Sequence, residues 1–255
     1  MSKLVYYRLL RQFFEELRFD LMSNVRSGRR ALARERGMLD GKKVIIVCNG
    51  PSLLSTEFDL LDGVFCIGLN KINLIFEKTR WRPNCIVAVN QKVMKQNEEF
   101  FRQSEIPLYL NRRLLTEPGG HPRASYLNCQ LPSGQFSTDA SQGVCQGFTV
   151  TYVALQLAYH FGAKETAVIG CDHNFVASGS PNSEATANGP DRNHFDPNYF
   201  TGGVSWDLPD LESSEYHYRL ALRAFEQDGR RLFNCTDGGK LEIFPRLTLR
   251  EFLEL

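Results

Sequence analysis

The sequence lacks the cysteine and glycine patterns that mark several common protein classes. Its seven cysteines contain no CxxC pair and lie mostly inside apolar runs, so we expect small buried side chains in a reducing compartment. GxxxxGK[ST] is absent, which excludes a P-loop kinase. GxGxxG is missing after the first expected strand, which argues against a dinucleotide-dependent oxidoreductase. GxSxG and HExxH are also absent.

The sequence also lacks a charge excess and a long hydrophobic run. Lys and Arg number 30 and Asp and Glu number 29, so no nucleic-acid partner is expected. No apolar run approaches the roughly 18–20 residues that cross a bilayer, and the chain does not begin like a signal peptide. We therefore predict a cytoplasmic protein. The metal-chelating DxD triplet of many nucleotide-sugar transferases is missing, and no metal site is predicted.

What the sequence does contain is a regular alternation of strand-like and helix-like segments between residues 39 and 255. This pattern predicts an α/β domain of βαβ units with a Rossmann-like, mainly parallel sheet. The length suffices for one such domain. The expected strands are 43–48, 64–69, 85–89, 107–110, 166–169 and 231–234. The expected helices are 91–103, 149–161 and 213–227.

Three segments depart from this alternation. Residues 1–38 carry apolar residues at three- and four-residue spacing, interleaved with arginines, which predicts an amphipathic, mildly basic helical segment. It can lie on the inner face of a membrane, or pack on the body or on a second subunit of a homo-oligomer. Residues 176–193 are polar and predict a lid loop. Residues 116–147 are rich in Pro, Gly, Ser and Gln, and we expect irregular structure there.

Three successive expected strands end in asparagine. The first strand leads into the turn Asn49, Gly50, Pro51 and Ser52, whose last two residues can open a helix. Asn70 and Asn90 follow the next two strands. Because ligands of open α/β sheets bind beyond the carboxyl ends of the strands, we expect these side chains to line one crevice. A carboxamide both donates and accepts, which suits a pyrimidine edge or ribose hydroxyls; the alternative is ordinary turn formation.

A second candidate binding segment opens the helix expected over 149–161. Gly147, Phe148 and Thr149 offer backbone N–H groups and a hydroxyl, which suit a phosphate or a carboxylate. The strand that follows this helix ends at Asp172, whose carboxylate can bind a ribose or sugar hydroxyl, or can cap the next turn. His173 follows directly and is a further candidate for the site.

The segment NHFDPNYF, directly after the expected lid, contains the candidate catalytic residues. His194 is the candidate general base, because imidazole titrates near neutrality. Tyr199 offers a hydroxyl to a departing phosphate. His217 lies in the helix expected over 213–227 and competes with His194 for the role of base.

Taken together, these motifs resemble the bacterial lipooligosaccharide sialyltransferases of glycosyltransferase family 42. They are also similar to related domains of flagellin nonulosonate transferases and of the archaeal 6-hydroxymethylpterin diphosphokinase. The resemblance covers roughly residues 42–240, with long gaps, and rests on KKVIIVCNGPSL, the two later asparagines, the Gly-Thr helix start and GAKETAVIGCD. It implies a variant nucleotide-sugar transferase fold and an inverting enzyme. Such an enzyme moves a sialic acid-like sugar from a CMP-activated donor to a glycan or lipid-linked acceptor, without metal or cofactor.

The resemblance further implies roles for individual residues. Asn49 and Gly50 would lie near the nucleotide phosphate and ribose, and Asn70 and Asn90 near the cytidine or the sugar. The turn from Gly147 to Thr149 would face the phosphate or the sugar carboxylate. In the sialyltransferases a histidine after the lid is the base and tyrosines stabilise the leaving phosphate, which implies His194 and the hydroxyls of Tyr199, Tyr216 and Tyr218.

The chain departs from the family after Asp172. His173 and Asn174 stand where the sialyltransferases carry an aromatic residue and a tyrosine. Two other functions stay open. One is a Mg²⁺-dependent diphosphokinase of a small pterin-like heterocycle, in which Asp172, Asp191 and Asp196 would hold the metal. The other is a nucleotide-binding module without catalysis.

Overall fold

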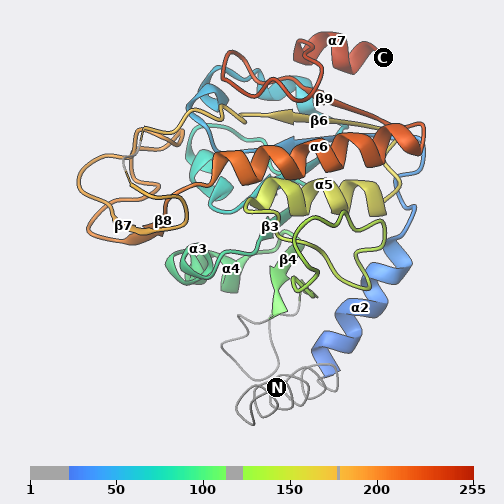
Figure 1. The fold of residues 1–255 in the computed structure, drawn as a ribbon, viewed down its shortest axis with the longest axis horizontal. Coiled ribbons are helices and arrows are strands. Elements are labelled where there is room, and N and C mark those ends of the chain that lie inside the picture. Colours follow the sequence, from blue (N-terminus) through green and yellow to red (C-terminus); the bar gives the residue numbers. More distant parts are fainter. Residues whose placement is uncertain (1–22, 113–122, 177–178) are drawn as a thin grey trace.

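The computed structural model describes residues 23–112, 123–176 and 179–255 and contains one seven-stranded sheet (Figure 1). All neighbouring strands in this sheet run parallel, in the order β5-β4-β3-β2-β1-β6-β9. The predicted α/β class and the Rossmann-like parallel sheet are therefore confirmed. The strands are β1 (Lys43–Val47), β2 (Phe65–Leu69), β3 (Cys85–Ala88), β4 (Leu108–Asn111), β5 (Ala124–Leu127), β6 (Glu165–Ile169) and β9 (Arg231–Asn234).

Both faces of the sheet are buried, which explains why its central strands are continuous apolar runs. In β1, Val44 and Ile46 face a layer that includes α2 (Ser23–Glu35), α5 (Val150–His160) and α6 (Leu211–Gln227). Ile45 and Val47 face the opposite layer, which includes α4 (Glu98–Gln103), α7 (Leu249–Glu254) and three short 3₁₀ turns, η1 (Pro51–Ser55), η2 (Phe58–Leu61) and η3 (Ile72–Glu77). Each fully buried side chain of this size contributes roughly 1.5–3 kcal/mol. Figure 1 shows α5 and α6 side by side over one face.

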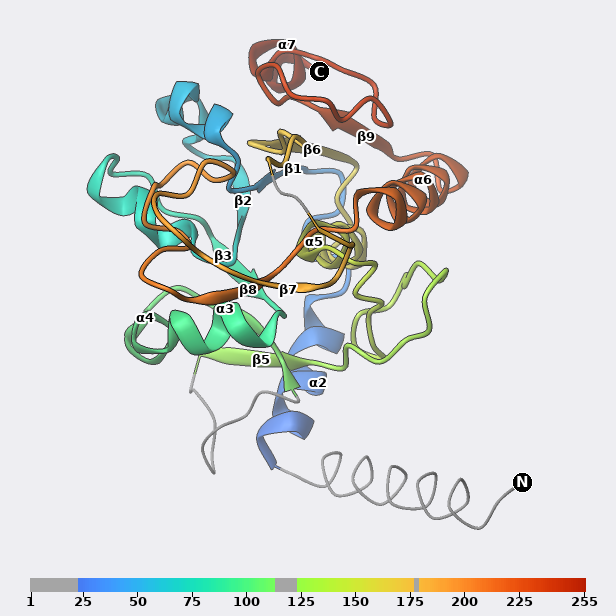
Figure 2. The ribbon, with the colours of Figure 1, turned by 60° about the vertical axis from the view of Figure 1, so that its left-hand side comes forward.

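The direction of strand order reverses at β1, which pairs with β2 on one side and with β6 on the other. Such a reversal leaves a crevice beyond the carboxyl ends of the strands. A small antiparallel sheet of β7 (Glu184–Thr186) and β8 (Ser205–Asp207) lies beside α3 (Gln91–Gln96), as Figure 2 shows. The Gln96 side chain donates a hydrogen bond to the Ser205 carbonyl at 2.8 Å and holds this sheet in place.

Several expected elements are wrong in detail. The helix expected over 91–103 is two helices, α3 and α4, separated at Asn97 (φ −116°, ψ 20°). The Asn97 amide donates to the Asn73 side chain at 2.8 Å, which ties this break to η3. The segment 116–147 contains the edge strand β5, and the expected lid contains β7. Helix α7 was not expected.

The amphipathic N-terminal segment is described only in part. Residues 1–22 lie outside the described residues, so membrane contact stays a prediction. The helix α2 packs on the body of the protein: Leu32 is buried, and its carbonyl lies 2.8 Å from Nε2 of His160 on α5. None of the helices in the described ranges is long and apolar enough to cross a bilayer.

A buried glutamine on α5 holds the irregular segment that follows β5. Oε1 of Gln156 accepts backbone N–H bonds from Ser137 (3.1 Å) and Cys145 (3.0 Å). Its Nε2 donates to the carbonyls of Cys145 (2.7 Å) and Tyr152 (3.0 Å). One side chain thus satisfies backbone groups that are buried away from water.

We expect Gln156→Leu to lower the free energy of unfolding by about 1–3 kcal/mol, because it leaves buried N–H groups without partners. Urea denaturation followed by circular dichroism measures this change. The matched control is Gln142→Leu on the exposed side of the same segment, which should stay within about 0.5 kcal/mol of the wild type. An unchanged midpoint for Gln156→Leu would contradict the assigned role.

Candidate functional site

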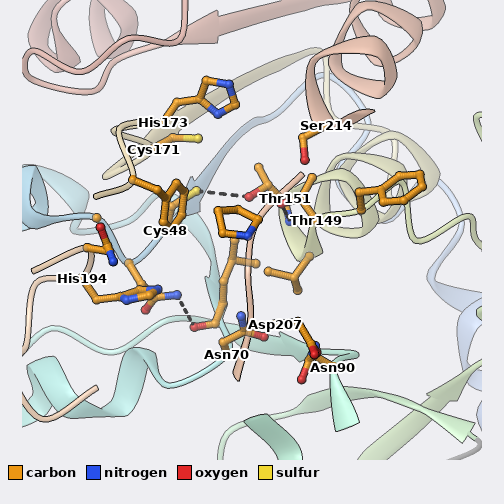
Figure 3. A pocket seen from close by; sticks show the side chains of 18 of the residues that line it. Cys48, Asn70, Asn90, Thr149, Thr151, Cys171, His173, His194, Asp207 and Ser214 are labelled. Atoms are coloured by element: carbon orange, nitrogen blue, oxygen red, sulfur yellow. Dashed lines mark hydrogen bonds between the residues drawn. The ribbon is translucent and has the colours of Figure 1, made fainter. Parts of the chain in front are cut away.

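A pocket of about 530 Å³ opens at the carboxyl ends of β1, β2, β3 and β6, where the strand order reverses (Figure 3). The structure brings most of the sequence-predicted site residues together in its lining. These residues are Asn49, Gly50, Asn70, Asn90, Phe148, Thr149, Asp172, His173, Asn174, His194 and Tyr199. The predicted residues outside the lining are Pro51, Ser52, Gly147 and His217.

Asn49 joins three parts of the site. Its side-chain Nδ2 donates to the Leu69 carbonyl at the end of β2 (3.0 Å), and its own carbonyl accepts from the Phe195 N–H (2.9 Å). The bond to the Leu69 carbonyl fixes which way the Asn49 amide is turned. Its oxygen, Oδ1, is then the polar atom of the side chain that this bond does not use. Among the described residues this buried Oδ1 has no hydrogen-bond partner. A buried acceptor of this kind is suited to a donor from a ligand.

Asn70 and Asn90 differ in which of their side-chain atoms are hydrogen-bonded. Asn70 has a left-handed backbone (φ 50°), and its buried Oδ1 also has no partner within the described part of the chain. Asn90 is the N-cap of α3: its Oδ1 accepts from the Val93 N–H (3.1 Å), and its Nδ2 donates to Asp207 (3.3 Å). The pocket therefore contains two acceptors without a described partner, Oδ1 of Asn49 and Oδ1 of Asn70. Both polar atoms of the Asn90 side chain are already hydrogen-bonded.

Asp172 caps the distant turn that follows β1, rather than the turn directly after it that the sequence offered as an alternative. Its carboxylate accepts from the Ser52 hydroxyl (2.7 Å) and from the Ser52 N–H (3.3 Å). Gly50 is required beside it, because a Cβ there would overlap the Asp172 carboxylate and lie 2.7 Å from the Gly170 carbonyl. The close approach of the two turns thus depends on the absence of a side chain at residue 50.

The N-terminus of α5 presents neutral donors to the pocket. Thr149 caps the helix through Oγ1, which accepts from the Thr151 N–H (3.3 Å) and lies 3.4 Å from the Tyr218 hydroxyl. Burial raises the pKa of Tyr218 well above its usual value, so its hydroxyl stays protonated. Gly147 (φ 55°) is held against the Tyr152 ring, and Phe148 is half exposed at the rim.

Two thiols lie on the floor of the pocket, at the ends of β1 and β6. Cys48 Sγ is 3.7 Å from Thr151 Oγ1, and Cys171 lies beside it (Figure 3). A hydrogen bond with Cys171 and burial raise the pKa of Cys48. All seven cysteines are buried and free, as the sequence predicted.

His194 is paired with a buried carboxylate. Its Nδ1 lies 2.8 Å from Oδ2 of Asp191, whose side chain is 4% exposed. Burial alone would raise the pKa of Asp191, but bonds from the His194 ring and from the backbone N–H groups of Asn193 and His194 hold that pKa below its usual value. The ionised carboxylate therefore accepts a hydrogen bond from Nδ1–H, and no described residue bonds to Nε2.

Tyr199 supports the imidazole from one side. The two rings are parallel, with centroids 3.8 Å apart and 1° between their planes. Tyr199 is 1% exposed, and burial raises its pKa, with the interaction from the Asn70 side chain opposing this only in part. The ring thus packs against His194, while hydrogen bonds from the Lys71 backbone and the Asn70 side chain act on its hydroxyl.

His217 has a structural environment. It is 1% exposed, and its Nδ1 donates to the Ser213 carbonyl at 2.7 Å. Its Nε2 accepts from the Gly134 N–H (3.1 Å) and lies 3.1 Å from the Ser133 hydroxyl. With both nitrogens engaged and the ring outside the pocket lining, His217 is not placed to contact a molecule in the pocket, whereas His194 lines it. Tyr216 is also outside the lining.

The charged side chains of the lining are engaged with local partners. Lys92 bridges Asp207 (2.6 Å) and Glu184 (2.8 Å), which ties α3 to the small sheet. Asp210 caps α6 through the Ser213 N–H (3.0 Å), and this bond lowers its pKa. His173 Nε2 lies 3.3 Å from the Glu215 carboxylate.

The carboxylates needed for a magnesium site are not grouped. Asp172 is bonded to Ser52, Asp191 to His194, and Asp196 to the Asn198 N–H at 2.8 Å. Within the ranges that the structure describes, no group of three His, Cys, Asp or Glu side chains is arranged to hold a metal ion.

Sequence reasoning missed the roles of several residues in this site. They are Lys71, Lys92, Asp191 and Asp207. The spacing of Asp191 and His194, i and i+3, was the one local signal, and it lay at the end of the segment interpreted as a lid.

Comparison with protein-family models and with curated proteins finds no match for this chain. The resemblance to sialyltransferases stays a prediction from the motifs.

The Asp191–His194 pair predicts a pH-dependent contribution to stability. A carboxyl whose pKa is depressed on folding stabilises the protein above its unfolded-state pKa, about 3.9 for Asp, and this contribution is lost as the pH falls through the folded pKa. We therefore expect Asp191→Asn to lower the free energy of unfolding at neutral pH, with the deficit shrinking below about pH 4. Urea denaturation at neutral pH and below about pH 4 measures this deficit in the free energy of unfolding.

The exposed Asp62 provides the control, and Asp62→Asn should match the wild type at both pH values. A deficit of Asp191→Asn that stays constant between neutral and acidic pH would contradict the ionised pairing.

Proposed function

We propose that the protein is a metal-independent, inverting glycosyltransferase that uses a CMP-activated acidic sugar as donor and a glycan or lipid-linked hydroxyl as acceptor. The observation that carries this proposal is the Asp191–His194 pair in the wall of a pocket that also contains unpaired asparagine oxygens. A basic N-terminal segment at the inner face of a membrane would keep the enzyme near a lipid-linked acceptor.

The nucleotide is proposed to occupy the floor between β1, β2 and α5. The free Oδ1 atoms of Asn49 and Asn70 can accept from a ribose hydroxyl or from the amino group of cytosine. The start of α5, with the hydroxyls of Thr149 and Tyr218, offers donors and a favourable helix dipole to the phosphate.

His194 is proposed to act as general base. Asp191 holds the proton on Nδ1, which leaves the Nε2 lone pair free to take the proton of the acceptor hydroxyl. As the acceptor oxygen bonds to the anomeric carbon, the bond from that carbon to the phosphate oxygen breaks, and CMP leaves as an anion. The donors at the start of α5 stabilise the charge that develops on the phosphate. A single displacement inverts the anomeric configuration.

A nucleotide screen tests the donor class. We expect CMP to raise the thermal midpoint without Mg²⁺, and CDP, UDP, GDP and ATP to raise it less, because the proposed floor matches a cytidine monophosphate. Differential scanning fluorimetry with and without Mg²⁺ measures this. Stabilisation by ATP only with Mg²⁺ would instead favour the pterin diphosphokinase. CMP binding without turnover of a CMP-sugar would favour the non-catalytic module.

The role of His194 is tested by His194→Ala. We expect sugar transfer to fall on the order of 10²–10⁴-fold, the usual contribution of a general base, while the affinity for CMP measured by calorimetry is retained. Transfer at the wild-type rate would remove His194 from the mechanism.

The comparison variant is His217→Gln. Because His217 bonds to Ser213 and Gly134 outside the pocket, we expect a lower thermal midpoint and a transfer rate close to that of the wild type. A collapse of transfer in this variant, with the fold intact, would reverse the assignment of the two histidines.

A further inference from the structure

Lys71 is a buried cation that has no part in the mechanism above. It directly follows Asn70, whose left-handed backbone turns the chain after β2, and it is 7% exposed. Its Nζ donates to the Tyr199 carbonyl at 2.6 Å. The same ammonium lies 5.3 Å from the centroid of the Tyr199 ring and 4.9 Å from that of Phe200. These contacts offset part of the cost of burying the charge.

The rings that contact Lys71 are the rings that contact His194. The imidazole stacks on Tyr199, and the Phe200 ring meets it edge-on, with centroids 5.2 Å apart and 90° between the planes. Asp191 acts on both side chains, because it bonds to His194 and its charge also stabilises the Lys71 ammonium. The lysine, the aromatic pair and the carboxylate thus form one buried assembly around the imidazole.

We propose that Lys71 is a positioning residue for His194, whose ammonium anchors the Tyr199 ring and thereby fixes the imidazole that stacks on it. This proposal rests on the proposed role of His194 as the base. An apolar side chain could fill the space beneath two aromatic rings without the desolvation cost of an ammonium. The ammonium adds a fixed bond to the Tyr199 backbone and a positive charge close to the imidazole.

The titratable groups around this assembly come from three parts of the chain. They are Lys71 after β2, Asp191 and Tyr199 in the segment around His194, and Cys48 at the end of β1. Desolvation lowers the pKa of Lys71 to about 8, and the charge of Asp191 opposes this shift. Burial raises the pKa values of Tyr199 and Cys48, so these two groups stay neutral through that range.

Proton NMR of the His194 ring tests the proposal without any substrate. The chain has five histidines, and the Cε1–H signal of His194 is assigned by its loss in His194→Gln. In the wild type, stacking on Tyr199 should shift this signal upfield. In Lys71→Met we expect the upfield shift to be lost, because the Tyr199 ring is no longer held. An unchanged His194 signal in folded Lys71→Met would overturn the proposal.

The matched control is Lys78→Met. Lys78 also contacts this segment, with Nζ 3.6 Å from Asp196 and 5.9 Å from the centroid of the Phe195 ring, but its side chain is 43% exposed. We expect its replacement to leave the His194 signal in place. Loss of the upfield shift in this variant as well would overturn the specific role of Lys71.

Steady-state kinetics supply a second readout. A purely structural role of Lys71 would not lower kcat while leaving the donor KM unchanged. With a CMP-sugar as donor, we expect Lys71→Met to lower kcat on the order of 10²-fold, as small misplacements of catalytic groups do, with donor KM unchanged. A rise in KM at constant kcat would overturn the proposal.

If Lys71→Met does not fold, the wild-type protein provides the test. The His194 signal should shift near pH 8, where Lys71 loses its charge. Absence of that shift would overturn the proposal. These NMR measurements need no turnover, so failure of the proposed transferase activity would be seen separately, in the wild-type transfer assay.

Discussion

The hydrogen bond between the Phe195 N–H and the Asn49 carbonyl joins the two halves of the site. On one side is the turn after β1, which the Asn49 amide also fastens to the end of β2 through the Leu69 carbonyl. On the other side is the segment that carries His194. Because Asn49 bonds in both directions through different atoms, the candidate base is held at a set distance from the sheet. A second bond, from the Lys71 ammonium to the Tyr199 carbonyl, ties the same segment to the end of β2.

The sequence predicted the central sheet because its strands are buried on both faces and therefore have continuous apolar runs. Strand β5 (ASYL) was missed because it has no β-branched residue and follows a stretch rich in proline and glycine. Asn97, where the expected helix breaks, bonds to the side chain of Asn73, 24 positions earlier, and a local sequence pattern does not reveal such a contact. Helix α7 did have a local signal, since Thr248 and Glu251 form a capping box.

For the site, the sequence indicated which residues gather at the strand ends but not how each is used. Periodicity and strand position suffice to place Asn49 and Asn70 together, because parallel strands end at one edge. They do not distinguish a free carboxamide from one that caps a helix, as Asn90 does. The bond between Lys71 and Tyr199 joins residues 128 positions apart, and no local pattern reports it.

The thiols on the pocket floor have a practical consequence. Cys48 and Cys171 are the cysteines that line the pocket, while the other five are buried elsewhere in the core. A molecule seated over the ends of β1 and β6 would shield both sulfurs from alkylating reagents. Because both thiols are buried and the pKa of Cys48 is raised, they react slowly with such reagents, and an occupant at this end of the sheet would slow that reaction further.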